Sequence, residues 1–215
     1  MISSTEKYEY SYSNSQPGHH HSYLIKPLME MISESLDIFE HQTKLRILDI
    51  GCGNGSLSSL IAHQGYEVVG IEESESGVEL ANQNFPNCRF IQGTIYNLPY
   101  AELGDKFDIV IAAEVIEHLF YPKELVRNVK QCLKQNGRLI LTTPYHGYLK
   151  NLMLAVSGKM DNHLTTLWDG GHIKFFSVAT MNELLKSENY TDIKFKFAGR
   201  FPYFWKSMLC SSTLI

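Results

Sequence analysis

Two carboxylates and an imidazole lie within five positions of one another in the stretch FDIVIAAEVIEHL: Glu114, Glu117 and His118. The residues before them are apolar enough to form a buried strand. If the chain turns helical there, the three side chains are related as i, i+3 and i+4 and share one face. Such a face could be a metal site, an acid–base site, or only the polar start of a helix. Which of the three it is depends on the elements that surround it.

A second stretch, RILDIGCGNGSLSSL, places three glycines at alternate positions between a strand and a helix. Gly51, Gly53 and Gly55 let the backbone turn sharply and approach a ligand closely, because no Cβ stands in the way. The free N–H groups at the start of the helix then point at that ligand. Glu72 ends the next strand, where a carboxylate can accept hydrogen bonds from both hydroxyls of a ribose. Its neighbour Glu73 competes for this role, and we prefer Glu72 because the apolar run stops immediately before it.

Strands and helices alternate through most of the chain. Strands are expected at 46–50, 67–71, 88–92, 107–113 and 138–143, and helices at 25–39, 56–64, 74–84 and 122–135, the last ended by Gly137. This alternation predicts an α/β fold, a Rossmann-like three-layer sandwich with a mostly parallel seven-stranded sheet. Further on, 178–187 is expected to be helical, and 191–199 with the C-terminal tail is expected to form an antiparallel hairpin at the sheet edge.

The chain of 215 residues is long enough for one sizeable core. We expect a flexible N-terminal arm over residues 1–21, rich in serine and tyrosine, and a single domain over 22–215. Residues 144–171 stand where a short connection would suffice. Ligands of an α/β sheet lie beyond the carboxyl ends of its strands, so this segment is expected to form a lid over an acceptor site. Its aromatic and methionine residues suit either an apolar acceptor or simple packing.

Apolar residues make up 44% of the chain, charged residues 20%, and the formal net charge is −4. This balance argues against a dedicated nucleic-acid binder. The four cysteines form no CxxC pair, which favours a reducing compartment. The polar start lacks a signal segment, and no apolar run approaches the roughly 18 residues of a spanning helix. We therefore expect a cytoplasmic protein without a membrane span, and the sequence leaves its oligomeric state open.

The glycine spacing distinguishes two kinds of ligand. A dinucleotide fingerprint requires G-x-G-x-x-G, and Ser56 stands where its third glycine should be. The spacing D-x-G-x-G-x-G instead resembles that of the class I S-adenosylmethionine-dependent methyltransferases. GIEES, FDIVIAAEVIEHL and RLILTTP follow in that order and extend the resemblance over roughly residues 20–200. The similarity is strongest to the ubiquinone-pathway-like small-molecule branch.

This resemblance implies that the glycine turn lies along the methionine part and the ribose of the cofactor, and that Glu72 holds the ribose hydroxyls. Thr94 stands where members commonly carry aspartate, so its hydroxyl would have to accept from the adenine amino group, and Ile95 would pack on the ring. The fourth strand would end beside the reacting methyl. The implied cofactor-binding residues are Asp49, Gly51, Gly53, Asn54, Gly55, Glu72, Thr94, Ile95, Ala113 and Glu114.

The predicted function is methyl transfer from S-adenosylmethionine to a small molecule, with a hydroxyl oxygen as the preferred acceptor and S-adenosylhomocysteine as the product. A hydroxyl must lose its proton as it is methylated. We assign that proton to His118, because an imidazole titrates near neutral pH; a structural role for His118 stays equally open. His172, in the segment GGHIKFFS, is the second catalytic candidate, with a core histidine as its rival interpretation.

Two alternatives remain. The ExxEH pattern also resembles the motif with which ubiquinone-pathway O-methyltransferases and small-RNA 3′-terminal 2′-O-methyltransferases can hold a divalent cation, and His172 could be a further ligand. A divalent metal is possible but not favoured, and no metal ligand is assigned. One alternative is therefore a metal-dependent RNA 3′-terminal 2′-O-methyltransferase, which the acidic balance opposes. The other is a non-catalytic domain that binds S-adenosylmethionine. The expected partner is a small-molecule methyl acceptor rather than a nucleic acid.

Overall fold

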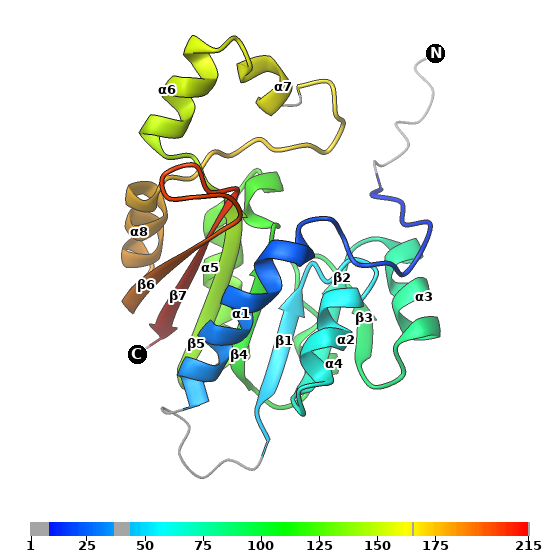
Figure 1. The fold of residues 1–215 in the computed structure, drawn as a ribbon. Helices are drawn as coiled ribbons and strands as arrows, with labels where there is room; N and C mark the ends of the chain where they lie inside the picture. The colour runs from blue at the N-terminus through cyan, green and yellow to red at the C-terminus, as the bar shows by residue number, and fades with distance from the viewer. Residues whose placement is uncertain (1–8, 37–43, 165, 215) are drawn as a thin grey trace, which may run out of the picture.

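The computed structural model describes residues 9–36, 44–164 and 166–214 (Figure 1). In this part of the chain, seven strands form one sheet in the order β3-β2-β1-β4-β5-β7-β6. The strands are β1 (Arg46–Ile50), β2 (Glu67–Glu72), β3 (Arg89–Gln92), β4 (Phe107–Ala113), β5 (Leu133–Pro144), β6 (Tyr190–Ala198) and β7 (Ser207–Leu214). The first five are parallel, and β7 is antiparallel to both of its neighbours. The predicted sheet and edge hairpin are confirmed.

Helices cover both faces of the sheet (Figure 1). They are α1 (His21–Leu36), α2 (Ser56–Ala62), α3 (Glu75–Asn84), α4 (Tyr100–Leu103), α5 (Pro122–Cys132), α6 (Tyr148–Val156), α7 (Met160–Leu164) and α8 (Val178–Ser187), with a 3₁₀ turn, η1, at Ile116–His118. Successive residues of a strand point to opposite faces. Accordingly, Ile47 packs in a core with Leu28 of α1, whereas Leu48 packs in another with Leu125 of α5. This is the predicted three-layer sandwich.

The end of α5 differs from the prediction. The helix ends at Cys132, and Gly137 lies inside β5 rather than terminating a helix. The reason is that Leu133 already pairs with Phe107 of β4, before an irregular stretch after which regular pairing resumes. The short helix α4 was not expected either. Phe39 and the beginning of the arm lie outside the described residues.

The predicted lid, residues 144–171, contains α6 and α7, and Figure 1 shows both helices beyond the carboxyl ends of the parallel strands. The backbone N–H of Tyr145 donates to the carbonyl of Lys206 at 2.9 Å, which joins the lid to the β6–β7 hairpin. The apolar residues of α6 do not form a core face, since Tyr148 is 86% and Val156 75% exposed. Among the described helices, none has the length and apolar character needed to cross a membrane.

The central strand β4 should dominate the stability of the fold. Ile111 is fully buried on β4, and truncating such a side chain removes apolar burial and leaves a cavity. We expect Ile111→Ala to lower the free energy of unfolding by about 2–5 kcal/mol in urea denaturation. Leu167→Ala is the control, because Leu167 is 97% exposed and should change it by less than about 0.5 kcal/mol. Equal losses in the two variants would contradict the assignment of the core.

Candidate functional site

The turn between β1 and α2 requires its glycines. Gly51, Gly53 and Gly55 have φ values of 71°, 57° and 79°, the left-handed region that other residues seldom adopt. A Cβ on Gly51 would lie 2.5 Å from a methyl of Val115. The N–H groups of Gly51 and Cys52 both donate to the carbonyl of Ile71, so the turn is fastened to the end of β2.

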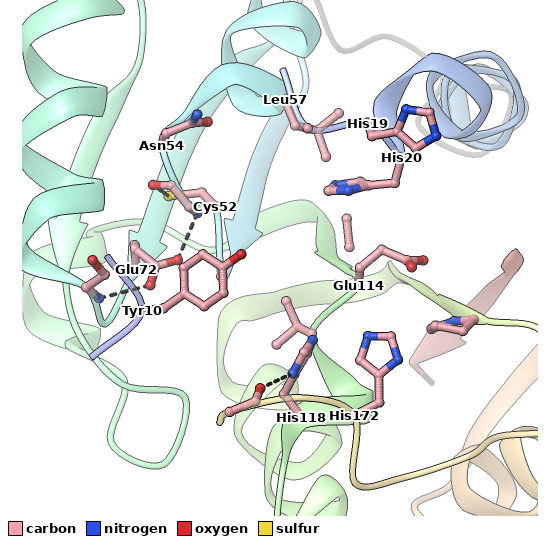
Figure 2. Close-up of a pocket in the computed structure, with 18 of the residues that line it drawn as sticks. Tyr10, His19, His20, Cys52, Asn54, Leu57, Glu72, Glu114, His118 and His172 are labelled. Carbon is pink, nitrogen blue, oxygen red and sulfur yellow. Dashed lines mark hydrogen bonds between the residues drawn. The ribbon is translucent and has the colours of Figure 1, made fainter. Parts of the chain in front are cut away.

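The carboxylate of Glu72 lies against this turn (Figure 2). One oxygen accepts the N–H of Gly53 at 2.8 Å and the other accepts the N–H of Ser74 at 2.9 Å. Burial raises the pKa of Glu72, while these backbone donors oppose the rise. The N–H of Glu73 acts on the same carboxylate, and since an ionised carboxylate offers about four acceptor positions, acceptor capacity remains for a ligand. Glu73 is exposed, which favours Glu72 as the acid of this site.

Asp49 is 1% exposed and lies beneath the turn, where it still contributes to the wall of the cavity. One of its oxygens accepts the hydroxyl of Ser58 on α2 at 2.6 Å, and the other has no hydrogen-bond partner in the described chain. Burial raises its pKa to about 6, against the effect of Ser58 and with a smaller contribution from Glu72. Asp49 therefore holds the start of α2 in place at a cost in stability.

The two residues expected beside the adenine have different positions. Ile95 is buried and lines the cavity. Thr94 does not line it, because its hydroxyl faces the following turn and accepts the N–H of Tyr96 at 3.4 Å. Gln92 and Tyr96 line the cavity on either side of this position.

Ala113 and Glu114 end β4 and line the cavity. Glu114 has a φ of 55°, and its carboxylate accepts the hydroxyls of Thr142 at 2.8 Å and Ser207 at 3.4 Å. Burial nevertheless raises the pKa of Glu114 to about 7. The helical turn begins only at Ile116, so Glu114 lies outside it. The expectation that Glu114 shares a helical face with the next carboxylate and histidine is therefore wrong.

Glu117 is fully buried, and neither of its carboxylate oxygens has a hydrogen-bond partner in the described chain. Burial, reinforced by Glu114, raises its pKa far above the usual range. Its backbone carbonyl accepts the N–H groups of Ile173 and Lys174, each at 2.9 Å. These two bonds hold His172 beside η1, although His172 lies more than 50 residues after η1 in the sequence.

The imidazoles of His118 and His172 lie side by side in the cavity, with ring centroids 4.8 Å apart (Figure 2). Nδ1 of His118 lies 2.7 Å from the carbonyl of Gly170. A carbonyl only accepts, so Nδ1 carries the hydrogen and Nε2 has a free lone pair when the ring is neutral. Burial, with a smaller effect of His118, lowers the pKa of His172 to about 4, which keeps it neutral at neutral pH.

Glu117, His118 and His172 together offer three donor atoms within 4.8 Å of one another. Nε2 of His172 lies 3.9 Å from the Glu117 carboxylate. Two imidazoles and one buried carboxylate suit a divalent cation that accepts mixed oxygen and nitrogen ligands. The residues present therefore fit such an ion, and its charge would compensate the buried carboxylate.

Apart from Gly55, Thr94 and the fully buried Glu117, these groups line one cavity of about 1440 Å³. A typical small-molecule site measures roughly 300–1,000 Å³, so this one has room for two ligands. Among the lid residues, His146, His163 and Trp168 line it. Tyr148 and Met153, two of the aromatic and methionine residues of the same segment, are exposed and do not line it.

The arm approaches the glycine turn closely, a possibility that the sequence left open while favouring a flexible arm. Residues 9–18 are neither helix nor strand, and Figure 1 shows this stretch crossing above the ends of β1 and β2. The ring of Tyr12 packs over Gly53 and Gly77, where an added Cβ would lie within about 3 Å of it. The side chain of Asn54 donates to the carbonyls of Asn14 and Gln16, both at 2.9 Å. The alternating tyrosines were the available signal; the mobility of the arm stays a prediction.

The family model described as "Methyltransferase domain" matches residues 41–192. A ubiquinone biosynthesis O-methyltransferase of Rickettsia akari is 36% identical over 107 residues, covering 48% of this chain and 41% of the relative. The mitochondrial ubiquinone biosynthesis O-methyltransferase of Schizosaccharomyces pombe is 27% identical over 152 residues, covering 67% and 54%. The chain thus spans about half the length of these curated relatives.

Solved structures share the fold. The magnesium protoporphyrin IX methyltransferase of Synechocystis, crystallised with bound SAH, superposes with a TM-score of 0.65 at 20% identity, covering 94% of this chain and 90% of that one. The YcgJ protein of Bacillus subtilis gives 0.63 at 23% identity, covering 91% and 98%. At these identities the likeness concerns the fold alone.

The raised pKa of Asp49 predicts that its ionisation lowers the free energy of unfolding as the pH rises. The unfolded carboxyl titrates near pH 4 and the folded one near 6, so its protonated form stabilises the fold below pH 4 and this contribution is lost as pH rises through 6. We expect Asp49→Asn, which keeps the Ser58 bond, to be more stable than the wild type by about 1–3 kcal/mol at pH 7.5.

The measurement is urea denaturation of both proteins at pH 7.5 and pH 4.5, where the difference should shrink. A variant that is less stable at pH 7.5, or a difference independent of pH, would contradict the buried ionised carboxylate.

Proposed function

Because this chain belongs to the methyltransferase domain family, we propose that it transfers the methyl group of S-adenosylmethionine to a hydroxyl oxygen of a small molecule and releases S-adenosylhomocysteine. The observation that carries the proposal is the common cavity. The glycine turn and Glu72 lie on one side of it, and Glu114, His118 and the lid lie on the other. A donor and an acceptor can therefore meet at the end of β4.

The cofactor would lie along the turn from Asp49 to Gly55. Its ribose hydroxyls would donate to the remaining acceptor capacity of the Glu72 carboxylate, and its adenine would pack against Ile95. The left-handed turn lets the chain approach the ligand without a side chain between them. Asn54 and Asp49 would act indirectly, by holding the arm and α2 respectively.

Methyl transfer needs alignment more than acid–base power. The S–CH₃ bond breaks as the O–CH₃ bond forms, the electron pair stays on sulfur, and the hydroxyl proton must leave. The free Nε2 of His118 is available for that proton, while the Gly170 carbonyl fixes the ring. Neutral His172 would orient the acceptor by a hydrogen bond.

A divalent cation is a second candidate component, favoured by the unpartnered carboxylate of Glu117. The residues that would hold it are Glu117, His118 and His172. Such an ion would lower the pKa of a bound hydroxyl and so make it a better nucleophile. In that case His118 would serve as a ligand rather than as the proton acceptor.

The names of the relatives support a hydroxyl acceptor, since both are O-methyltransferases of ubiquinone biosynthesis. These comparisons give no support to the RNA-terminal alternative. A domain that only binds the nucleoside would not need the cluster of Glu117, His118 and His172, which we call the η1 site.

The ribose contact predicts a loss of cofactor affinity. Glu72→Gln removes the charge from the acceptor of two hydroxyls, which is worth about 1.5–3 kcal/mol, or roughly 10- to 100-fold in Kd. Isothermal titration with S-adenosylhomocysteine measures it, with Glu73→Gln expected to lose much less. If Glu73→Gln loses more than Glu72→Gln, the wrong acid has been assigned, and if the wild type gives no heat the proposed function fails.

The η1 site predicts a proton-linked metal titration. Because burial raises the pKa of Glu117 and so favours its protonated form, binding of Mn²⁺ should release a proton, and the measured heat should depend on the ionisation enthalpy of the buffer. Glu117→Gln should weaken Mn²⁺ binding by about tenfold or more.

If Mn²⁺ gives no heat and EDTA leaves methyl transfer unchanged, the metal is excluded. His118 then remains as the proton acceptor, and His118→Gln should abolish the acidic limb of the pH–rate profile.

A further inference from the structure

The charged residues of the cavity differ in sign along the sheet, with Glu114 after β4 between the two groups and acting electrostatically on Lys150. The carboxylates of Asp49 and Glu72 lie at the ends of β1 and β2. Toward the opposite end of the strand order, the segment after β5 and the β6–β7 hairpin contribute Lys150, Arg200 and Lys206. We call these three residues the cationic end of the cavity.

Lys150 is the central residue of the cationic end. It lies on α6 and is only 6% exposed, although it lines the cavity. Its ammonium donates to the carbonyl of Tyr145 at 2.8 Å, which uses one of three N–H groups. A buried ammonium with unused donors that face a cavity is costly unless an acceptor occupies that cavity.

No carboxylate of the described chain lies within ion-pair distance of any residue of the cationic end. Cations elsewhere behave differently, since Lys196 pairs with both Glu30 and Glu34 on the outer surface. Arg200 has a left-handed φ of 63°, which is unfavourable for a residue with a side chain. The hairpin thus holds an unpaired guanidinium at the cavity in spite of backbone strain.

One backbone unit positions two of these cations. The carbonyl of Tyr145 accepts from Lys150, and its N–H donates to the carbonyl of Lys206. The Tyr145 ring packs edge-on against the stacked rings of Phe197 and Trp205, at centroid distances of 5.4 and 5.3 Å. The backbone that carries Lys150 and Lys206 is therefore held by the core, whereas Arg200 is exposed.

The neighbouring histidines add hydrogen-bonding capacity but little charge. Burial lowers the pKa of His146 to about 4, and that of His163 is lowered in the same way. Nε2 of His163 is buried without a partner in the described chain. Burial, reinforced by Arg200 and opposed by Glu114, lowers the pKa of Lys150 to about 8, so it remains mostly charged at pH 7.

We propose that the cationic end binds an anionic group of the methyl acceptor, a carboxylate or a phosphate, through Lys150, Arg200 and Lys206. The anion fixes the acceptor at one end, and its hydroxyl extends toward His118 and the cofactor. The acceptor class is then a hydroxyl compound that carries a negative charge. This inference rests on the proposed function for the direction of the hydroxyl, but the anion site itself does not.

The test uses the full chain, with and without saturating S-adenosylhomocysteine. Isothermal titration compares 4-hydroxybenzoate and phenyl phosphate with the neutral isostere 4-hydroxybenzamide. We expect at least one anion to bind about tenfold or more tightly than the amide, because charge-assisted hydrogen bonds are roughly twice as strong as neutral ones. The better of the two anions identifies the carboxylate or the phosphate as the preferred group.

Lys150→Met and Arg200→Gln should each remove most of this preference without changing the affinity for S-adenosylhomocysteine. Arg200 is exposed, so its variant remains informative if Lys150→Met fails to fold. Lys186→Met, on the surface of α8, changes the net charge equally and should leave the preference intact. The proposal is overturned if no anion binds more tightly than the amide, or if Arg200→Gln and Lys186→Met behave alike. Absence of heat with S-adenosylhomocysteine would count against the proposed function alone.

Discussion

The carboxylate of Glu72 links the two segments that form the expected nucleoside-binding side of the cavity. It accepts one N–H from the glycine turn after β1 and another from Ser74, the N-cap of α3 after β2. Parallel strands bring these two segments to the same edge of the sheet, and Glu72 adds a shared acceptor to the bonds from Gly51 and Cys52 to the carbonyl of Ile71. The site is therefore organised by the same acid that would bind the ligand, and its geometry exists before the ligand arrives.

The distribution of charge fits the reaction we propose. The sulfonium loses its charge during transfer, so tight ion pairing with the donor would stabilise the reactant more than the transition state. Three carboxylates that line the cavity already accept protein donors: Ser58 for Asp49, backbone N–H groups for Glu72, and Thr142 for Glu114. These bonds disperse the negative charge. At the cationic end, in contrast, no carboxylate of the described chain forms an ion pair, although the ammonium of Lys206 lies 4.8 Å from the ring centroid of Tyr23.

The sequence predicted the alternation of strands and helices, the three glycines and Glu72, because each depends on local rules of periodicity, backbone conformation and strand ends. It misplaced Glu114, since a single left-handed residue ends β4 and shifts the start of the turn. The partnership of His172 with η1 depends on backbone bonds between segments far apart in the chain, which no local pattern encodes. Lys150 was missed for a similar reason, because a lysine on an amphipathic helix is expected to be solvated.

The protonation state of Glu117 distinguishes the two mechanisms considered for this site. The two backbone bonds from Ile173 and Lys174 hold His172 in place whether or not a cation is bound, so the arrangement of the three side chains does not discriminate between the two mechanisms. A buried carboxylate without partners cannot remain charged alone, and it must either keep a proton or neutralise its charge against a cation. With the proton, His118 is free to act as a base; with the cation, His118 becomes a ligand and the acceptor hydroxyl is acidified directly. The proton on Glu117 is thus the quantity that separates an acid–base methyltransferase from a metal-assisted one built on the same backbone.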